Sequence, residues 1–147
     1  MKKIPFVDLQ QILIQHQQYL SGDPAGMQAR LQEVDLFGVN FASLDLRKAN
    51  FRGANLKRVV FWNTNLEGAD LEDADLKHAV MEGANLKGAI LKNTNLKGVN
   101  LEQCDLRGCD LSRANIDSAD FDGAVYDQST RWPDHFDPGK AGAVFAE

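Results

Sequence analysis

The chain lacks the features that mark membrane proteins, exported proteins and strongly basic nucleic-acid binders. No stretch approaches the roughly 20 apolar residues that a membrane-spanning helix needs. Lys2 and Lys3 open the sequence, but Asp8, Gln10 and Gln11 interrupt what would have to be the apolar part of a secretory signal. The formal net charge is −5, which argues against direct nucleic-acid binding. We therefore expect a cytoplasmic protein of 147 residues in one domain, with no membrane association.

The chain also lacks a catalytic constellation. Its three histidines are His16, His78 and His135, and no Ser or Cys nucleophile has a base at a defined spacing. A Gly-rich phosphate loop and a zinc signature are both missing. The sequence therefore predicts a protein that is not an enzyme and that uses no cofactor and no metal.

What the sequence does contain is a run of twenty five-residue units in unbroken phase, from Ala29 to Gln128. The third position of each unit is always large and apolar, and the first is small or middling in all units but one. The second position is Asp or Asn in fifteen units, and Gly is the last residue in eight of the twenty. A repeat of this regularity predicts a solenoid, because each unit can bury its apolar positions only against its neighbours.

A period of five fits neither an α-helix nor a flat strand. Positions one and three can point inward, as in a short strand, while the remaining residues turn a corner. The Asp or Asn between them points outward, where its side chain can bond nearby backbone and favour a turn. A chain that bends the same way every five residues winds into a coil, and successive coils can pair as parallel strands about 4.8 Å apart.

Units such as ANLKG, ADLED and ANLKR closely resemble the A-(D/N)-L-x-x motif of the pentapeptide repeat family. The resemblance implies an all-β solenoid, a right-handed quadrilateral parallel β-helix with four units per coil. Twenty units then give about five coils, and residues twenty apart stack into ladders. Leu56 should accordingly lie beside Leu76, and Val60 beside Val80.

Residues 1–28 follow a different pattern and are predicted to form an N-terminal capping helix and linker. Asp8 and Gln11 have the spacing of a capping box, and Ser21-Gly22 offers a helix stop. The first coil of a solenoid exposes an apolar end, which we expect this helix to cover. Its apolar stripe, at steps of three and four residues, consists of Phe6, Leu9, Ile12, Leu13, His16, Tyr19 and Leu20.

The repeat region is predicted to span residues 29–128, and residues 129–147 to form a C-terminal cap or tail. The five-residue phase breaks at Ser129-Thr130-Arg131. We expect the aromatic residues that follow, such as Trp132 and Phe136, to plug the end of the last coil. Asp137-Pro138 offers a start for a short terminal helix.

Because the interior is filled by the repeat, function should lie on the outer surface. The outward second position is apolar at Val60 and Val80, and Trp62 belongs to the same unit as Val60. Such a group is typical of a protein contact surface, in which aromatic anchors carry much of the binding energy. The alternative is that Val occurs there because β-branched residues suit strands.

A second outer feature is a strip of positive charge formed by Lys57, Arg58, Lys77 and Lys97, flanked by His78. A regular basic strip could hold a polyanion. The alternative is a solvated face whose lysines discourage pairing with other chains.

A third feature is local acidity. Glu82, Glu102 and Asp122 stack on the same side as Trp62. The alternative interpretation is an ordinary mixed, soluble surface.

Cysteine occurs only at Cys104 and Cys109, both on the small inward position. We expect two buried, reduced thiols that act as small apolar residues. A disulfide or a metal site is the alternative, although no His or second Cys pair lies at ligand spacing.

The leading functional hypothesis is a non-enzymatic scaffold or protein-interaction module that presents rigid faces to a protein partner or to a second copy. The family resemblance implies an alternative, since some members imitate DNA and shield type II topoisomerases such as gyrase from poisons. A net charge near −4 over the repeats and the interrupting lysine strip argue against that role. A secreted effector that carries a repeat module is the third hypothesis.

Overall fold

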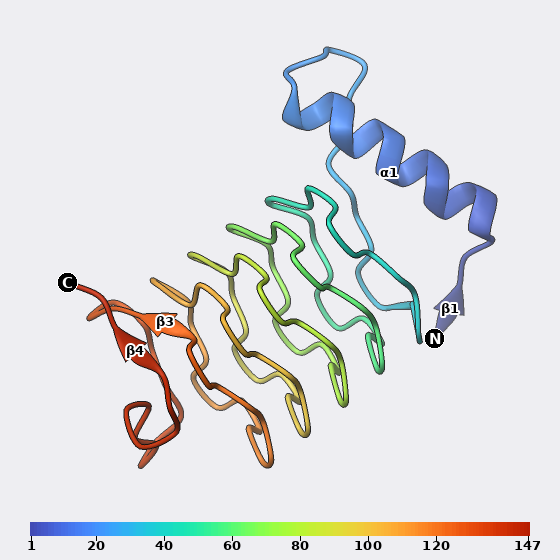
Figure 1. Cartoon of the computed structure of the whole chain (residues 1–147). Helices are drawn as coiled ribbons and strands as arrows, with labels where there is room; N and C mark the ends of the chain where they lie inside the picture. Colours follow the sequence, from blue (N-terminus) through green and yellow to red (C-terminus); the bar gives the residue numbers. More distant parts are fainter.

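The five-residue units stack with a repeat of twenty residues along the chain. The computed structural model describes residues 1–147 and pairs Arg30 with Asn50, Asn50 with Asp70, and Asp70 with Ile90, all in parallel. The same step of twenty connects Asn55 to Asp75 and Val60 to Val80, which is the register that the sequence predicted. Figure 1 shows the resulting stack of similar coils, with the helix at the N-terminal end.

Most of the pairing consists of single bridges between coils, so named strands are few and short. The elements in chain order are β1 (Lys2–Lys3), α1 (Phe6–Leu20), β2 (Val34–Asp35), β3 (Val125–Tyr126) and β4 (Val144–Phe145). β1 pairs in parallel with β2, and β3 pairs in parallel with β4. The sequence pattern did not predict β1 or β4.

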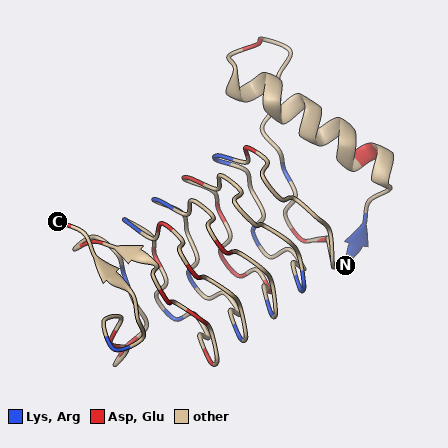
Figure 2. Cartoon of the chain, viewed as in Figure 1, with Lys and Arg blue, Asp and Glu red and all other residues tan.

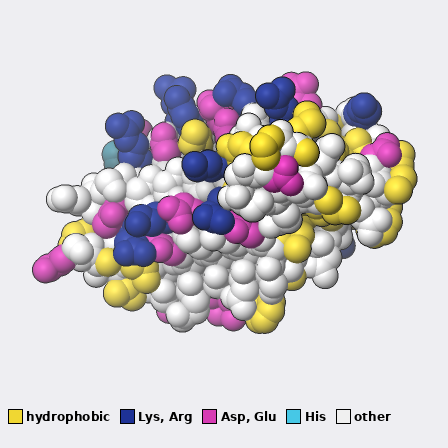
Figure 3. Space-filling view, turned by 90° about the horizontal axis from the view of Figure 1, so that it is seen from above, with side chains coloured by type: hydrophobic (Ala, Val, Ile, Leu, Met, Phe, Trp, Pro, Cys, Tyr) yellow, Lys and Arg dark blue, Asp and Glu magenta, His cyan; other side chains and the backbone are white.

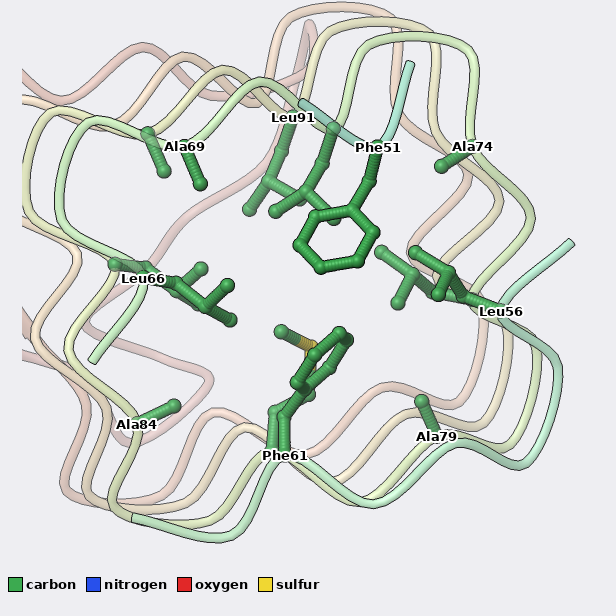
Figure 4. Packing of buried hydrophobic residues seen from close by; sticks show 14 of the residues in the cluster. Phe51, Leu56, Phe61, Leu66, Ala69, Ala74, Ala79, Ala84 and Leu91 are labelled. Carbon is green, nitrogen blue, oxygen red and sulfur yellow. The ribbon is translucent and has the colours of Figure 1, made fainter. Parts of the chain in front are cut away.

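The inward positions form one continuous apolar column. Phe51, Leu56, Phe61 and Leu66 are fully buried and point into the interior from different sides, with small Ala side chains between them (Figure 4). The rings of Phe41 and Phe61 stack with centroids 5.3 Å apart, one coil above the other. Large third-position side chains therefore fill the column, and small first-position residues leave them room.

The corners depend on the last residue of each unit. From Glu33 to Gly123, every fifth position has a positive φ, whether it is Gly or not. Gly adopts this conformation without a steric penalty, which explains why it closes so many units. The second-position Asp and Asn side chains support the same turn: Asn40 Oδ1, for example, accepts the Ala42 N–H at 2.9 Å.

Helix α1 starts differently from the prediction. The N-cap residue is Pro5, whose carbonyl accepts the N–H groups of Asp8 and Leu9, and no side chain caps the helix. The predicted capping box of Asp8 and Gln11 is therefore wrong, because Asp8 already lies inside the first turn. The predicted stop is confirmed, since Ser21 is the C-cap and Gly22 has φ +83°.

The stripe of α1 is also narrower than predicted. Leu9 and His16 are buried, and Ile12 and Leu13 pack against the core, but Phe6 is 73% exposed. Phe6 is the first residue of α1, and its side chain does not join the core. α1 also falls short of the length and apolar character that crossing a bilayer takes.

The C-terminal segment follows the coil with altered register. Asp110 pairs with Arg131, twenty-one residues on, and Val125 pairs with Val144, nineteen residues on. One residue is thus inserted where the five-residue phase breaks. The Trp132 ring packs edge-on against Phe121 and Tyr126, with centroids 5.4 and 5.6 Å apart. The predicted helix start at Asp137-Pro138 is wrong, because these residues form turns that lead into β4.

Candidate interaction surface

The three residues of the predicted contact patch lie on one side of the coil. We call this side, formed by residues 39–43, 59–63, 79–83, 99–103 and 119–123, the Trp62 face. Val60 pairs directly with Val80 in the next coil, and Trp62 lies in the turn that follows Val60. Val60 is half-buried, Val80 is 37% exposed and Trp62 is 45% exposed. The patch is therefore open to solvent.

The two valines replace residues that would help the turn. At Asn100 and Asp120, elsewhere in the same column, the side-chain oxygen accepts the backbone N–H two residues on, at 2.9 and 3.0 Å. Val60 and Val80 cannot make this bond, and their side chains do not enter the core. Since Val at this position forgoes a local hydrogen bond, strand preference alone is a weak reason for it.

The same face becomes acidic further along the coil. Glu82 and Glu102 follow Trp62 in the column of fourth positions, and Asp120 and Asp122 lie in the next coil. The neighbouring Asp120 carboxylate raises the pKa of Glu102. The ion pairs of the structure leave these carboxylates out; they join Arg47–Asp45, Arg52–Glu72, Arg52–Asp73, Lys57–Asp75 and Arg107–Asp105. The acidic half of the face therefore has no cationic partner within the chain.

The predicted basic strip lies at the corner that precedes the Trp62 face. Figure 2 shows Lys and Arg recurring at the same corner of successive coils. Lys57, Arg58, Lys77 and His78 line a shallow pocket of about 210 Å³ together with Phe37. Lys57 Nζ also lies 3.4 Å from the Asp75 carboxylate, so part of its charge is balanced. Lys97 continues the same column one coil further on.

Phe37 was missed by the sequence interpretation. Its side chain is 57% exposed at the top of the basic strip. The available signal was a Phe at the outward fourth position of the unit VDLFG. Three further apolar residues, Phe6, Val7 and Ile14, are exposed on α1. Figure 3 shows apolar side chains at the helix end of the molecule and a smaller apolar group at the opposite end, with Lys, Arg, Asp and Glu side chains distributed between them.

Three titratable side chains are buried: Cys104, Cys109 and His16. Cys104 and Cys109 are free and buried, and burial raises the pKa of Cys104 to about 12 and that of Cys109 well above its usual value. The Cys104 thiol donates to the Met81 carbonyl at 2.8 Å. Both cysteines therefore pack in the apolar column as small residues, as the sequence predicted.

His16 is fully buried between α1 and the first coil. Its Nδ1 accepts the Ala29 N–H at 2.9 Å, so the neutral ring carries its proton on Nε2. Burial lowers the pKa of His16, against smaller opposing effects of the Arg47 backbone and the Asp45 carboxylate. No three His, Cys, Asp or Glu side chains converge in a way that could hold a metal ion.

Comparison with known proteins gives one family and a set of related folds. The family model for pentapeptide repeats matches in eight copies, over residues 28–53, 54–93 and 94–125. No curated protein matches the chain.

Among solved structures, a pentapeptide repeat protein from the thylakoid lumen of Arabidopsis thaliana is 28% identical, with a TM-score of 0.65 over 67% of this chain and 68% of that one. The pentapeptide repeat protein Rfr23 from the cyanobacterium Cyanothece 51142 is 37% identical, with a TM-score of 0.58 over 69% and 65%. A pentapeptide repeat protein from Nostoc PCC 7120 is 26% identical, with a TM-score of 0.51 over 90% and 93%.

Proposed function

This chain belongs to the pentapeptide repeat family, and on that premise we propose that it is a non-enzymatic interaction module. Its rigid coil presents flat outer faces to a protein partner. The partner binds at the Trp62 face, with Trp62 as the anchor and Val60 and Val80 beside it.

The observation that carries the proposal is the half-exposed indole ring of Trp62. It lies on the outer face of a rigid coil, which cannot rearrange to bury the ring. Hot-spot residues at protein interfaces are enriched in Trp, and they act best when apolar neighbours exclude water. Val60 and Val80 supply such neighbours at the expense of the turn bond that Asn or Asp makes in the same column. The three residues therefore have no role in the coil that explains them as well as a contact does.

The non-enzymatic part of the proposal is supported by the state of the reactive groups. The two thiols are buried and protonated, and His16 is neutral and enclosed. The carboxylates on the outer faces are open to water, which leaves them without the enclosure that an acid or base catalyst usually has.

We also infer the finer architecture of the family: a right-handed quadrilateral β-helix of about five coils, with α1 as the N-terminal cap. The step of twenty between paired residues supports four sides per coil. Burial of Leu9 and His16 against the coil, and the bond from the Gln17 side chain to the Asp45 carbonyl, support the capping role of α1.

A DNA-imitating role at a type II topoisomerase has less support. A DNA-like surface should be continuously negative, and here the corner of Lys57, Lys77 and Lys97 interrupts the acidic faces. A supercoiling assay with and without a quinolone tests that alternative directly.

The experiment that tests the proposal is partner capture from the native lysate with the wild type, Trp62→Ala and Phe37→Ala. Phe37 is the matched control, because it is also an exposed aromatic residue at a corner but lies outside the Trp62 face. We expect Trp62→Ala to lose the captured protein and Phe37→Ala to retain it, with unchanged circular dichroism in both. Equal capture by all three proteins would refute the proposed site.

A further inference from the structure

The Trp62 face carries opposite charges along its two edges. The corner that leads into the face holds the basic strip, and the column that leaves it holds Trp62, Glu82 and Glu102. Between the edges runs the middle column, in which Val60, Val80 and Asn100 pair from coil to coil. The residues at the leading corner of the same three coils are Lys57, Arg58, Lys77, His78 and Lys97.

Two copies of this face can meet about a two-fold axis in two simple orientations, and only one of them brings opposite charges together. A two-fold axis in the plane of the contact and parallel to the coil axis exchanges the two edges while it keeps every coil at its own level. A two-fold axis that crosses the coil axis leaves each edge opposite itself, so like charges meet. Homodimers are usually closed by such a two-fold axis, which makes the parallel arrangement the one to consider.

The parallel arrangement pairs unlike groups in three successive coils. Lys77 then lies opposite Glu82 of the second copy, and Lys97 lies opposite Glu102. In the first of the three coils Arg58 lies opposite Trp62, a pairing suited to a cation–π contact. The charges are in register because both copies have the same rise per coil, about 4.8 Å.

The middle column suits close approach of two copies. Val60 and Val80 each face their own counterparts across the axis, and both are short enough to let the walls meet. Four charged side chains on the two edges can pair with a second copy, because they form no ion pair within the chain: Lys77, Lys97, Glu82 and Glu102. Lys57 is paired with Asp75, but an exposed pair of this kind contributes little and can rearrange.

From this pattern we propose that the Trp62 face binds a second copy of the chain, side by side and in parallel. The basic corner of each copy lies against the acidic edge of the other. This inference rests on the proposed function, because it names the occupant of the same surface.

The contact should be small and weak. In the next coil Asp117 would meet Asp122, and Asp120 would meet its own counterpart, so favourable pairing stops after Glu102. Favourable pairing covers only three coils, about 14 Å of height. The contact should therefore bury much less than the roughly 800 Å² per partner of a standard interface. Association should therefore be observed at high protein concentration and should weaken as salt screens the charges.

Cysteine crosslinking tests the orientation. Asn100 in the middle column should face its own counterpart, so Asn100→Cys is expected to form a covalent dimer under mild oxidation. Asn95→Cys is the matched control, because Asn95 occupies the same position of the preceding unit in the same coil and also accepts a backbone N–H. The native thiols are buried and should not react.

A second site separates the parallel dimer from the crossed one. Val60→Cys lies two coils away from position 100 and should also crosslink to itself in the parallel dimer. In a crossed dimer only one level can meet itself, so crosslinking at one of the two positions alone would overturn the proposal. Crosslinking of Asn95→Cys to the same extent as Asn100→Cys would also overturn it.

Charge exchange tests the pairing. Sedimentation equilibrium up to about 1 mM protein should show that Lys77→Glu and Glu82→Lys each raise the dissociation constant at least about tenfold. The double variant Lys77→Glu/Glu82→Lys should restore association, which a misfolded protein could not do. A wild type that stays monomeric at the highest concentration, or a double variant no better than the single ones, would refute the inference. The proposed function survives that result if Trp62→Ala still abolishes partner capture, and it falls with the inference only if capture is unaffected as well.

Discussion

The coils and the ends of this molecule are held to the same core in different ways. In the coils each residue inherits its surroundings from its place in a five-residue unit, and each backbone bond recurs twenty residues later. At the ends the contacts are individual. Leu9 and His16 bury one short stripe of α1, and the Gln28 side chain donates to the Lys48 carbonyl. The contacts of the helix are thus made once each, while the backbone hydrogen-bond pattern of the coil is made many times.

This difference predicts where the stability lies. A residue in the middle of the stack has a coil on both sides, so its loss is felt by two neighbouring coils at once. A residue of α1 has a coil on one side and solvent on the other. The variants below test that contrast, from the largest expected effect to the smallest.

Removing a central side chain should produce the largest loss. Leu76 is completely buried in the middle of the stack, with Leu56 and Leu96 on either side. We expect Leu76→Ala to lower the free energy of unfolding by about 3 to 5 kcal/mol, through lost burial and the cavity that remains. Leu9→Ala, at the end, should lose only about 2 kcal/mol because the helix can settle into the space. Urea unfolding followed by circular dichroism measures both, and an equal loss would contradict the contrast.

A corner Gly should come next. Gly88 has φ +67°, and a Cβ added there would meet no atom within 4 Å. Gly88→Ala therefore adds the cost of a positive φ, roughly 1 to 2 kcal/mol, and the lower entropy of the unfolded chain offsets part of it. We expect a net loss of about 0.5 to 1 kcal/mol in the free energy of unfolding. Gly139→Ala in the C-terminal segment is the control, since Gly139 does not have a positive φ. If both variants have the same melting temperature, the corner conformation is not what selects Gly.

The contrast between coils and ends also explains how much of the fold could be predicted. The alternation within each unit encodes inward and outward positions directly. The pairing of Val60 with Val80 then followed from the four units per coil that the family resemblance implied. The Asx bonds of the second position followed from the chemistry of Asp and Asn. The N-terminal and C-terminal segments lie outside the repeat, so no sequence period predicts which residues pair there. The pairing of Lys2 with Val34 depends on where α1 directs the chain, and the shift at Arg131 depends on a single inserted residue.

The candidate surface shows the same limit. Val60 and Val80 were identified because an apolar residue at the second position breaks the repeat rule, and Trp62 was included because it belongs to the same unit as Val60. Phe37 was not singled out, since the fourth position has no rule to break. The exposure of Phe6 could not be predicted either, because the spacing of apolar residues along a helix does not show which of its turns packs against the first coil.

The junction between α1 and the first coil should give the ends a pH dependence that the coils lack. Burial holds the pKa of His16 below its ordinary value of 6.5. As pH falls below about 6.5, His16 becomes protonated in the unfolded chain but stays neutral in the folded chain. The free energy of unfolding therefore decreases until the pH reaches the lower pKa of His16 in the folded chain. Above that range the contribution is constant.

His16→Asn isolates this effect, because the Asn side-chain oxygen can still accept the Ala29 N–H. We expect the wild type to lose more of its melting temperature than His16→Asn between about pH 7.5 and pH 5.5. Both proteins carry the same exposed carboxylates, so the difference between their profiles reports His16 alone. Parallel profiles would mean that the helix end is no more sensitive to acid than the coils.

The smallest effect should be a gain at a coil corner. Lys48 has φ +62°, a conformation that costs a non-Gly residue roughly 1 to 2 kcal/mol. Lys48→Gly removes that strain but raises the entropy of the unfolded chain, which offsets roughly 0.5 to 1 kcal/mol. We expect a net gain of about 0.5 kcal/mol.

Lys87→Gly is the control for this gain, because Lys87 is also an exposed coil lysine but occupies the fourth position, where φ is not positive. There only the entropy term acts, so the free energy of unfolding should fall by about 0.5 to 1 kcal/mol. Opposite signs for two Lys→Gly changes on the same coil surface would show that place within the unit, rather than residue type or exposure, decides the outcome. Equal signs would mean that the corners tolerate side chains at no cost, and the excess of Gly among them would then need a cause other than backbone conformation.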